Sequence, residues 1–403
     1  MPKLRFKGFT DDWEQRKLGD IAGTTYGGGT PKTSVEEYWN GDIPWIQSSN
    51  LTENELFSVD IQKQITETGL NKSAAQLVPG NSIAVVSHVG VGKLVFMPME
   101  YTTSQDFISL SGLQTEPKFT CYALHRRLQQ DLHIVQGSAI KGITKEDLLS
   151  KEISAPSLEE QVKIGDYFRK LDNLIALHQR KCEVLKEVKK YMLQKMFPKK
   201  GEKVPEIRFA GFTGDWEQRK LGDIAGRTYG GGTPKTDVDE YWEGEIPWIQ
   251  SSNLTEHQLF DIDIQKHITE KGLQKSATQL VPANSIAVVS HVGVGKLVYM
   301  PFQYTTSQDF ISLAELKTEP KFTSYAIYKR LQKDMHIVQG SAIKGITKDD
   351  LLSKEISVPD YEEQEQIGTY LSNLDNLIAL HQRKHETLKE IKKYMLQNMF
   401  PKK

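Results

Sequence analysis

The stretch FTDDWEQRKLGDIAG at residues 9–23 returns at residues 212–226 as FTGDWEQRKLGDIAG, with one substitution. The repeat continues on both sides at a constant spacing, so that Arg5 corresponds to Arg208 and His88 to His291. Roughly four fifths of the corresponding positions are identical, over a period far longer than that of solenoid repeats. The 403-residue chain is therefore a duplicated module, and its length alone favours two or more domains.

Composition is that of an ordinary globular protein, with 38% hydrophobic residues, 26% charged residues and a formal net charge of −1. Because there is no overall basic excess, any contact with nucleic acid must come from local patches. The two cysteines, Cys121 and Cys182, correspond to Ser324 and His385 in the other copy, which argues against disulfides or a thiolate metal site. The start MPKLRFKGF lacks the apolar core of a signal peptide, and no apolar run reaches membrane-spanning length. We therefore expect a cytoplasmic protein.

The first part of each module, about residues 18–156 in the first copy, predicts a compact mixture of short strands, turns and a helix. NSIAVVSHVGVGKLVFMP, residues 81–98, predicts two strands joined by a glycine-containing turn at residues 90–92. KFTCYALHRRLQQDLHIVQG, residues 118–137, has leucines at helical spacing and stops at a glycine.

The second part of each module predicts one long helix. Ser157 and Glu160 have the spacing of an N-cap and its capping-box partner, and Asp360 and Glu363 hold these places in the second copy. The following apolar residues step by three or four, and at about 1.5 Å per residue each helix would be roughly 60 Å long. The two apolar stripes are Ile164, Phe168, Leu171, Ile175, His178, Cys182, Leu185, Val188 and Met192, and Ile367, Leu371, Leu374, Ile378, His381, His385, Leu388, Ile391 and Met395.

Neither stripe can be buried by its own helix, so the two helices are expected to pack on each other. An antiparallel pair places one globular domain at each end and relates the copies by a pseudo-twofold axis, and we expect this direction. The predicted fold class is α+β, with two globular domains joined by two long antiparallel helices. The predicted segments are 1–156 for the first domain, 157–200 for the first helix, 201–359 for the second domain and 360–403 for the second helix.

The segment QGSAIKGITKEDLLSKEISAPSLEEQVKIGDYFRKLDNLIALHQRKCEVLKEVKKYMLQKMF, residues 136–197, resembles the conserved regions of the specificity subunits of type I restriction-modification systems. It recurs at residues 339–400, and DWEQRKLGDIAG, GGTPKT and IPWIQSSNL are similar to the opening of that family's target-recognition domains. The resemblance covers nearly the whole chain. It implies two target-recognition domains that bind double-stranded DNA, in a complex with two methyltransferase subunits and two restriction-translocase subunits.

Polar side chains next to glycines and strand ends are the candidate DNA contacts. In YGGGTPKT, Thr30, Lys32 and Thr33 are suitable donors to phosphates, although a plain surface loop explains the segment equally well. In IPWIQSSNL, Gln47 could pair bidentately with adenine beside Ser48 and Ser49, whereas the neighbouring tryptophan is expected in the core. The corresponding residues of the second copy are Thr233, Lys235, Thr236, Gln250, Ser251 and Ser252.

Three further segments contribute candidates, each with a structural alternative. HVGVGKL lacks the spacing of a Walker loop and predicts a β-turn, from which Lys93 could reach a phosphate. YTTSQDF offers Ser104 and Gln105, for which turn-forming roles are as good an explanation, and QGSAIKGIT places Lys141 before an expected helix start at Thr144. The corresponding residues are Lys296, Ser307, Gln308 and Lys344.

Catalytic signatures are not found. The chain lacks a methyltransferase's Asn/Asp-Pro-Pro-aromatic tetrapeptide and its glycine-rich cofactor loop, and it has no helicase Walker pair. His178 and His381 are expected to pack within the apolar stripes and not to bind a metal. We therefore predict a non-catalytic subunit without cofactor or metal. The competing hypotheses are a DNA-independent coiled-coil scaffold and, more weakly, a nucleotide-dependent enzyme that uses GVGK.

Segments 43–53, 81–95, 101–110 and 133–145 are letter for letter the same as their counterparts, and they carry most of the candidate contacts. Two equal reading surfaces predict the same half-site twice, hence a split inverted repeat with half-site centres roughly one helical turn apart. That target would be unusual for the family, whose recognition domains generally differ. The side chains off the apolar stripes are candidates for binding the methyltransferase or for capping the local core: Tyr191, Leu193, Phe197, Tyr394, Leu396 and Phe400.

Overall fold

The computed structural model describes residues 1–134, 142–337 and 345–401. The chain divides into two compact units: unit 1 comprises Met1–His178 and Lys384–Lys403, and unit 2 comprises Gln179–Arg383. Each unit therefore holds one globular domain together with a stretch of each long helix.

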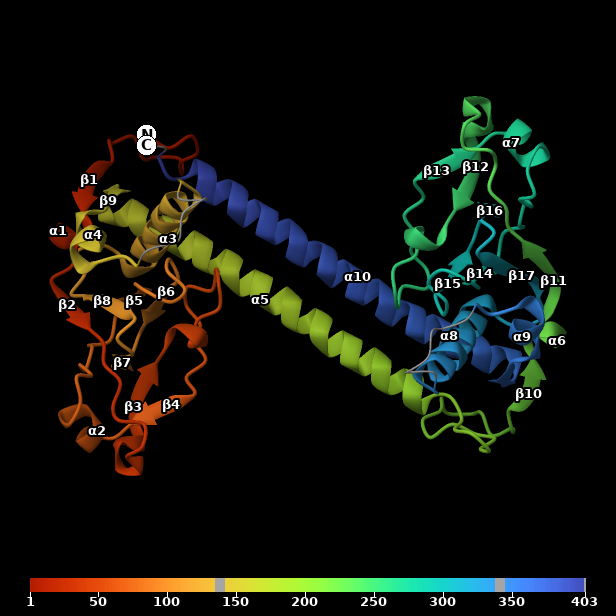
Figure 1. Cartoon of the computed structure of the whole chain (residues 1–403), viewed down its shortest axis with the longest axis horizontal. Coiled ribbons are helices and arrows are strands. Elements are labelled where there is room, and N and C mark those ends of the chain that lie inside the picture. Colours follow the sequence, from red (N-terminus) through yellow and green to blue (C-terminus); the bar gives the residue numbers. More distant parts are fainter. Residues whose placement is uncertain (135–141, 338–344, 402–403) are drawn as a thin grey trace. The chain divides into compact units, whose positions relative to one another are not determined.

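The elements follow the repeat in order (Figure 1). Those of the first copy are β1 (Glu14–Lys17), α1 (Leu18–Ile21), β2 (Thr24–Gly27), η1 (Glu36–Tyr38), β3 (Trp39–Ile46), η2 (Ser48–Asn50), β4 (Lys63–Ile65), α2 (Glu67–Asn71), β5 (Ser82–Val86), β6 (Leu94–Met97), β7 (Thr102–Thr103), β8 (Phe107–Ser111), α3 (Pro117–Ile134), α4 (Lys145–Ser150), β9 (Glu152–Ala155) and α5 (Leu158–Lys195). Those of the second copy are β10 (Glu217–Lys220), α6 (Leu221–Ile224), β11 (Ala225–Gly230), η3 (Asp239–Tyr241), β12 (Trp242–Ile249), η4 (Ser251–Asn253), β13 (Lys266–Ile268), α7 (Glu270–Gln274), β14 (Ser285–Val289), β15 (Leu297–Met300), β16 (Thr305–Thr306), β17 (Phe310–Leu316), α8 (Pro320–Ile337), α9 (Lys348–Ser353), β18 (Glu355–Val358) and α10 (Tyr361–Asn398).

A four-stranded antiparallel sheet, in the order β2-β8-β5-β6, forms the centre of the globular domain in unit 1. Alternate side chains of a strand point to opposite faces, so the fully buried run SIAVV indicates a strand covered on both sides. Ile83 and Val85 join a core cluster with residues of α3, whereas Ala84 and Val86 join a second cluster with Ile46 of β3. Unit 2 repeats this sheet in the order β11-β17-β14-β15.

A second, smaller sheet has the order β4-β3-β7, with β3 antiparallel to β4 and parallel to β7. The register of β3 shifts between Trp39 and Ile43, and within this bulge Asn40 has a positive φ of 62°. Trp39 then meets Trp45 edge to face, with ring centroids 5.3 Å apart. A further two-stranded pair, β1 with β9, connects the start of the module to the strand that leads into α5.

The long helices pair in opposite directions within each unit, as predicted. In unit 1, Leu171 near the start of α5 shares a core cluster with Leu388 and Met395 near the end of α10. In unit 2, Met192 near the end of α5 packs on the cluster that contains Leu374 near the start of α10. Each helix has 38 residues, and the predicted apolar stripe is the buried face. The predicted fold class, α+β with two domains joined by antiparallel helices, is confirmed.

One position of the second stripe differs from the prediction, because Ile391 is 40% exposed. Its neighbour Lys392 turns inward instead, and its Nζ lies 2.5 Å from Oδ1 of Asp172 on α5. The hydroxyl of Tyr122 on α3 donates to the other carboxylate oxygen of Asp172, at 2.6 Å. A buried ammonium needs such a partner, and the ion pair ties both long helices to the globular domain.

Of the side chains off the stripes, Phe197 and Phe400 are buried, at 5% and 3% exposure. Phe400 stacks on Phe119 and Phe197 on Phe322, each with centroids 5.5 Å apart. For these two residues the core-capping alternative is therefore the correct one. Tyr191 and Tyr394 are 51% and 58% exposed.

None of the helices in the described part of the chain has both the length and the apolar character of a membrane span.

Candidate nucleic-acid interface

Three segments that carry predicted contacts converge in unit 1: the loop after β2, the turn after β3 and the turn after β7. The Gly29 amide donates to the Thr103 carbonyl at 2.8 Å, and the Ser104 amide donates to the Ile46 carbonyl at 2.9 Å. A Cβ built at Gly28 would lie only 1.8 Å from the Ser104 carbonyl oxygen, so this approach requires glycine. The glycines of YGGGTPKT therefore serve a close backbone contact.

Unit 2 repeats the convergence almost unchanged. The Gly232 amide donates to the Thr306 carbonyl at 2.8 Å, and the Ser307 amide to the Ile249 carbonyl at 2.9 Å. A Cβ at Gly231 would lie 1.9 Å from the Ser307 carbonyl oxygen. The two copies thus present the same constellation.

Thr30 and Gln105, predicted from separate segments, are brought into direct contact. Thr30 Oγ1 donates to Gln105 Oε1 at 2.8 Å, and both side chains are exposed. The same bond joins Thr233 and Gln308 at 2.7 Å. An amide oxygen has two lone pairs and the amide nitrogen two donors, so Gln105 retains an acceptor and donors for a base edge.

Gln47, Ser48 and Ser49 follow β3 on a turn that Asn50 fixes. The Gln47 amide donates to Asn50 Oδ1 at 2.8 Å, and the Asn50 amide returns a bond to the Gln47 carbonyl at 2.9 Å. Asn50 itself is buried. Ser49 is exposed, whereas Gln47 and Ser48 are half-buried. Ser49 is therefore the most accessible donor and acceptor of this turn, and Gln250, Ser251 and Ser252 have the same exposure classes.

Ser104 is brought to the same place but is buried, at 4% exposure. Its Oγ donates to Asp106 Oδ2 at 3.3 Å and accepts from the Asp106 amide at 3.4 Å. Ser307 makes the same two contacts with Asp309. This geometry favours the turn-forming alternative for both serines.

Lys32 and Thr33, like Lys235 and Thr236, are exposed on the loop after β2 or β11. Lys93 is different: its Nζ donates to the Leu51 carbonyl at 2.9 Å, and the side chain is half-buried. Lys296 binds the Leu254 carbonyl in the same way at 2.9 Å. These two lysines hold the β5–β6 and β14–β15 turns against the segment after the η2 and η4 helices.

The GVGK segment forms a hairpin turn between strands β5 and β6, with positive φ at Gly90 and Gly92. A phosphate-binding Walker loop leads into a helix, whereas Lys93 leads into a strand. The β-turn interpretation therefore agrees with the structure. Within the described residues, no group of three or more His, Cys, Asp or Glu side chains is placed to hold a metal ion.

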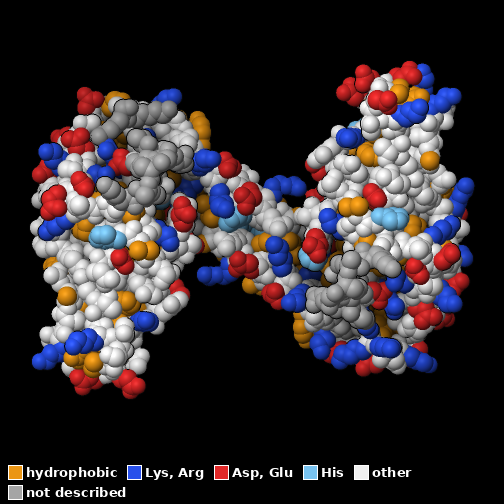
Figure 2. Space-filling model, viewed as in Figure 1, with side chains coloured by type: hydrophobic (Ala, Val, Ile, Leu, Met, Phe, Trp, Pro, Cys, Tyr) orange, Lys and Arg blue, Asp and Glu red, His pale blue; other side chains and the backbone are white. Residues whose placement is uncertain are grey.

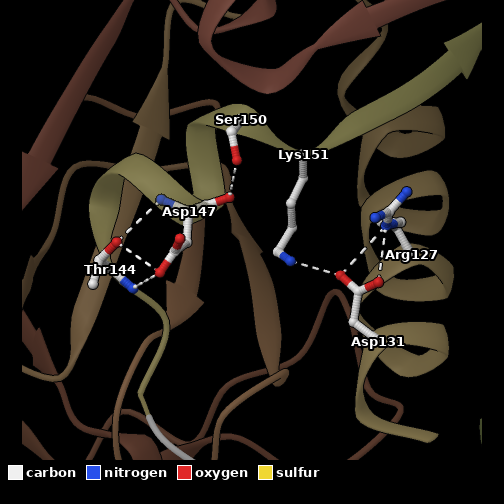
Figure 3. Close-up of polar contacts among 6 residues, drawn as sticks. All are labelled: Arg127, Asp131, Thr144, Asp147, Ser150 and Lys151. Carbon is white, nitrogen blue, oxygen red and sulfur yellow. Dashed lines mark hydrogen bonds and ion pairs between the residues drawn. The ribbon is translucent and has the colours of Figure 1, made fainter. Parts of the chain in front are cut away.

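Lys141 and Lys344 lie outside the described residues, but the helix expected to follow them begins where predicted. Thr144 Oγ1 accepts from the Asp147 amide at 3.1 Å and donates to Asp147 Oδ2 at 2.8 Å (Figure 3). The Asp147 carboxylate thus occupies the first turn of α4, where it would repel a phosphate. Figure 3 also shows that Lys151 and Arg127 both pair with Asp131, which joins the end of α4 to α3.

Sequence reasoning missed Lys63, which lies beside this site. Its Nζ is 5.4 Å from the ring centroid of Trp39 and 5.7 Å from that of Trp45. Trp45 was expected in the core and is 3% exposed. Lys266 sits in the same way over Trp242 and Trp248. The available signal was that this lysine is kept in both copies while the next residue changes from Gln64 to His267.

Charge on the face shown in Figure 2 is mixed, with basic and acidic side chains interspersed over both units. This distribution agrees with the formal net charge of −1. Any attraction to DNA would therefore depend on individual cations and not on a general basic field.

Comparison with known proteins gives the family. The model of the type I restriction modification DNA specificity domain matches twice, at residues 10–187 and 213–390. The chain belongs to this family. The specificity subunit of the type I restriction enzyme MjaIX from Methanocaldococcus jannaschii is 24% identical, over 96% of this chain and 92% of that protein. The specificity subunit of EcoR124I/EcoR124II from Escherichia coli is 30% identical over 44% of this chain and 48% of its own length.

Solved structures show the same fold. The crystal structure of the S subunit of a type I restriction-modification system from M. genitalium matches with a TM-score of 0.67 and 15% identity, covering 100% of this chain and 99% of that one. A structure described under complex assembly and conformational transition of the type I system matches with a TM-score of 0.51 and 16% identity, covering 96% of this chain and 97% of that one. The matching family model and the specificity subunits among the relatives confirm the resemblance found in the sequence, and the chain belongs with specificity subunits and not with the catalytic subunits.

Proposed function

We propose that this chain reads a bipartite DNA target for a type I restriction-modification complex, with one recognition domain for each half of the target. The observation that supports it is the convergence of three loops that present Thr30, Ser49 and Gln105, and their counterparts, at the same place in both units. Hydroxyl and amide groups match the donors and acceptors on base edges. In this proposal residues 1–156 and 201–359 are the recognition domains, and 157–200 and 360–403 are the helices between them.

The two half-sites should have the same sequence. The side chains at the convergence are identical in the two units, and so are the hydrogen bonds that hold them. If the copies have the twofold relation expected from the sequence repeat, the half-site is presented once on each strand. The target is then a split inverted repeat, with half-site centres roughly one helical turn apart.

The test is to map the methylated bases in cells that carry the complete system. An inverted repeat with equal halves is the expected result. A bipartite motif with unrelated halves would show that differences such as Thr24 against Arg227, or Asn54 against His257, alter base recognition. That result would contradict the equivalence of the two reading surfaces while leaving DNA recognition itself in place.

The partners in this proposal are two methyltransferase subunits and two restriction-translocase subunits. Each long helix has exposed apolar side chains: on α5 these are Leu174 at 42%, Leu177 at 45% and Tyr191 at 51%. The counterparts Leu377, Leu380 and Tyr394 are exposed to 42%, 43% and 58% on α10. Exposed apolar groups at matching positions fit a partner that binds twice.

Co-purification tests this part of the proposal. A Tyr191→Ala, Tyr394→Ala double variant should recover less methyltransferase than the wild type. Lys186→Ala with Lys389→Ala is a matched control, since both lysines are exposed on the same helices. Undiminished recovery with the tyrosine variant would place the methyltransferase elsewhere.

The competing hypothesis is a DNA-independent scaffold. A specificity subunit should retain its target over a scrambled duplex at moderate salt, because base contacts add to the phosphate contacts. A scaffold should show only weak binding that salt removes without regard to sequence. The mapped motif supplies the duplex for this comparison.

A further inference from the structure

Each unit carries one exposed lysine held against a pair of perpendicular tryptophan rings. The Trp39 and Trp45 rings meet at 87°, and Lys63 lies over both. The Trp242 and Trp248 rings meet at 90°, with Lys266 over both. Neither ammonium has a carboxylate partner among the described residues.

The same two indoles hold the candidate DNA-contacting loop. Trp45 Nε1 donates to the Gly29 carbonyl at 3.0 Å, and Trp39 Nε1 donates to the Lys32 carbonyl at 3.2 Å. In unit 2 the corresponding bonds, to Gly232 and Lys235, measure 3.0 and 3.1 Å. One rigid aromatic pair therefore fixes both the lysine ammonium and the loop that carries Thr30.

The register of β3 and β4 explains how the lysine comes to lie there. Lys63 is directly opposite Trp45 in the antiparallel ladder, and side chains that face each other across such a ladder share one face of the sheet. Ile65, the next residue on this face, is fully buried and continues the cluster below the tryptophans. Lys63 thus lies at the edge of this cluster, with an exposed side chain.

Two roles fit a lysine in this position. In the first role only its methylene stem matters and covers the tryptophans, as long charged side chains often do at the edge of a core. In the second role the positive charge matters. The ring faces attract the ammonium and hold it in place, so the side chain loses less conformational entropy when an anion binds. The mixed charge on the face shown in Figure 2 and the net charge of −1 favour the second role, because individual cations must then supply the attraction to DNA.

We propose that Lys63 and Lys266 each contact one backbone phosphate of the bound DNA, and that the tryptophan pair positions the ammonium for this contact. The inference rests on the proposed function and adds a pair of residues to it. It follows that the two lysines contribute to affinity and to its salt dependence but not to the choice of bases, because phosphate contacts carry no sequence information.

The experiment measures the affinity of the full-length chain for two duplexes between about 50 and 200 mM salt, one with the mapped motif and one scrambled. Lys63→Met with Lys266→Met keeps the stem that covers the tryptophans and removes the charge. The slope of log affinity against log salt should become shallower by about 1.8, at about 0.9 for each phosphate contact, on both duplexes. The ratio of the two affinities should stay the same, and Lys63→Arg with Lys266→Arg should keep the wild-type slope.

Lys72→Met with Lys275→Met is the matched control, since these lysines are exposed in the same domains and are also identical between the copies. A wild-type slope in the Lys63/Lys266 methionine variant would overturn the inference, and so would an equal loss of slope in the control. If the wild type bound both duplexes equally, the proposed base recognition would fail, but the slopes would still decide whether the two lysines contact phosphates.

Discussion

Unit 1 and unit 2 reach the same packing from different connections of the chain. In unit 2 the amide of Ile207 donates to the Lys195 carbonyl at 3.0 Å, at the point where the chain passes from α5 into the second copy. In unit 1 the amide of Leu4 donates to the Asn398 carbonyl at 2.9 Å, although these residues come from opposite ends of the described chain (Figure 1). The side-chain and backbone contacts, and not the covalent link, therefore close each unit.

The largest effect should come from the phenylalanine that caps each unit. Phe400→Ala removes a ring that contacts Trp13, Phe119 and Phe168, and should destabilise unit 1 by about 3–5 kcal/mol. Phe197→Ala should have a similar cost in unit 2 and little effect in unit 1. Hydrogen exchange measures the stability of each unit separately. The β6 peptide of unit 1 contains Phe96 and the β15 peptide of unit 2 contains Tyr299, so the two peptides differ in mass. An equal loss in both units from either variant would show that the units do not unfold separately.

The second prediction concerns the stability of the two units at acidic pH, which should differ because the units differ in one buried residue. Burial lowers the pKa of His125 to about 4, with a smaller effect from Lys392, whereas the corresponding residue of unit 2 is Tyr328. The unfolded chain protonates this histidine near pH 6.5, whereas the folded chain protonates it only near pH 4. The free energy of unfolding of unit 1 therefore has its full value above pH 6.5 and decreases as the pH falls toward 4. The loss should be about 3 kcal/mol in total.

The control for this prediction is the pair found in unit 2, where His257 Nδ1 and the Tyr328 hydroxyl lie 2.5 Å apart. Asn54→His with His125→Tyr should remove the extra acid sensitivity of unit 1. Glu116 and Glu319 have raised pKa values through burial in both units, so their effects cancel in the comparison. Urea unfolding of wild type and variant at about pH 7 and pH 5 measures the difference, and equal shifts would contradict the role of His125.

The long helices were predictable because their signal is local. An apolar residue at every third or fourth position, with no proline between Pro156 and Pro198, predicts a long helix without knowledge of the rest of the fold. The ion pair between Lys392 and Asp172 could not be predicted, because no local pattern connects positions so far apart.

The same distinction applies to the candidate site. Residue type alone singles out Thr30 and Gln105, but their hydrogen bond depends on the parallel pairing of β3 with β7, which the sequence does not predict. Ser104 resembled its exposed neighbour in composition, yet its position behind the Gly28 backbone buries it. Lys63 became visible only once the ladder of β3 and β4 placed it opposite Trp45.

The smallest predicted effect concerns backbone strain, which differs between otherwise equal bulges. Asn40 in β3 and Glu243 in β12 have φ angles of 62° and 60°, and both side chains are exposed. Asparagine tolerates this left-handed region better than glutamate, because its short polar side chain can bond locally. Glu243→Asn should therefore stabilise unit 2 by about 1 kcal/mol, and Asn40→Glu should destabilise unit 1 by about as much.

Glu245→Asp is the control for this comparison, since residue 245 is exposed in the same strand, corresponds to Asp42 in the first copy and has no positive φ. Its effect on stability should be within a few tenths of a kcal/mol. Hydrogen exchange in β15 and β6 measures the stability of unit 2 and unit 1 separately, as for the phenylalanine variants. If Glu243→Asn and Glu245→Asp stabilised unit 2 equally, loss of the glutamate and not relief of φ would be the cause. If Asn40→Glu left the stability of unit 1 unchanged, the bulge would accept either residue, and the glutamate in the second copy would not destabilise unit 2.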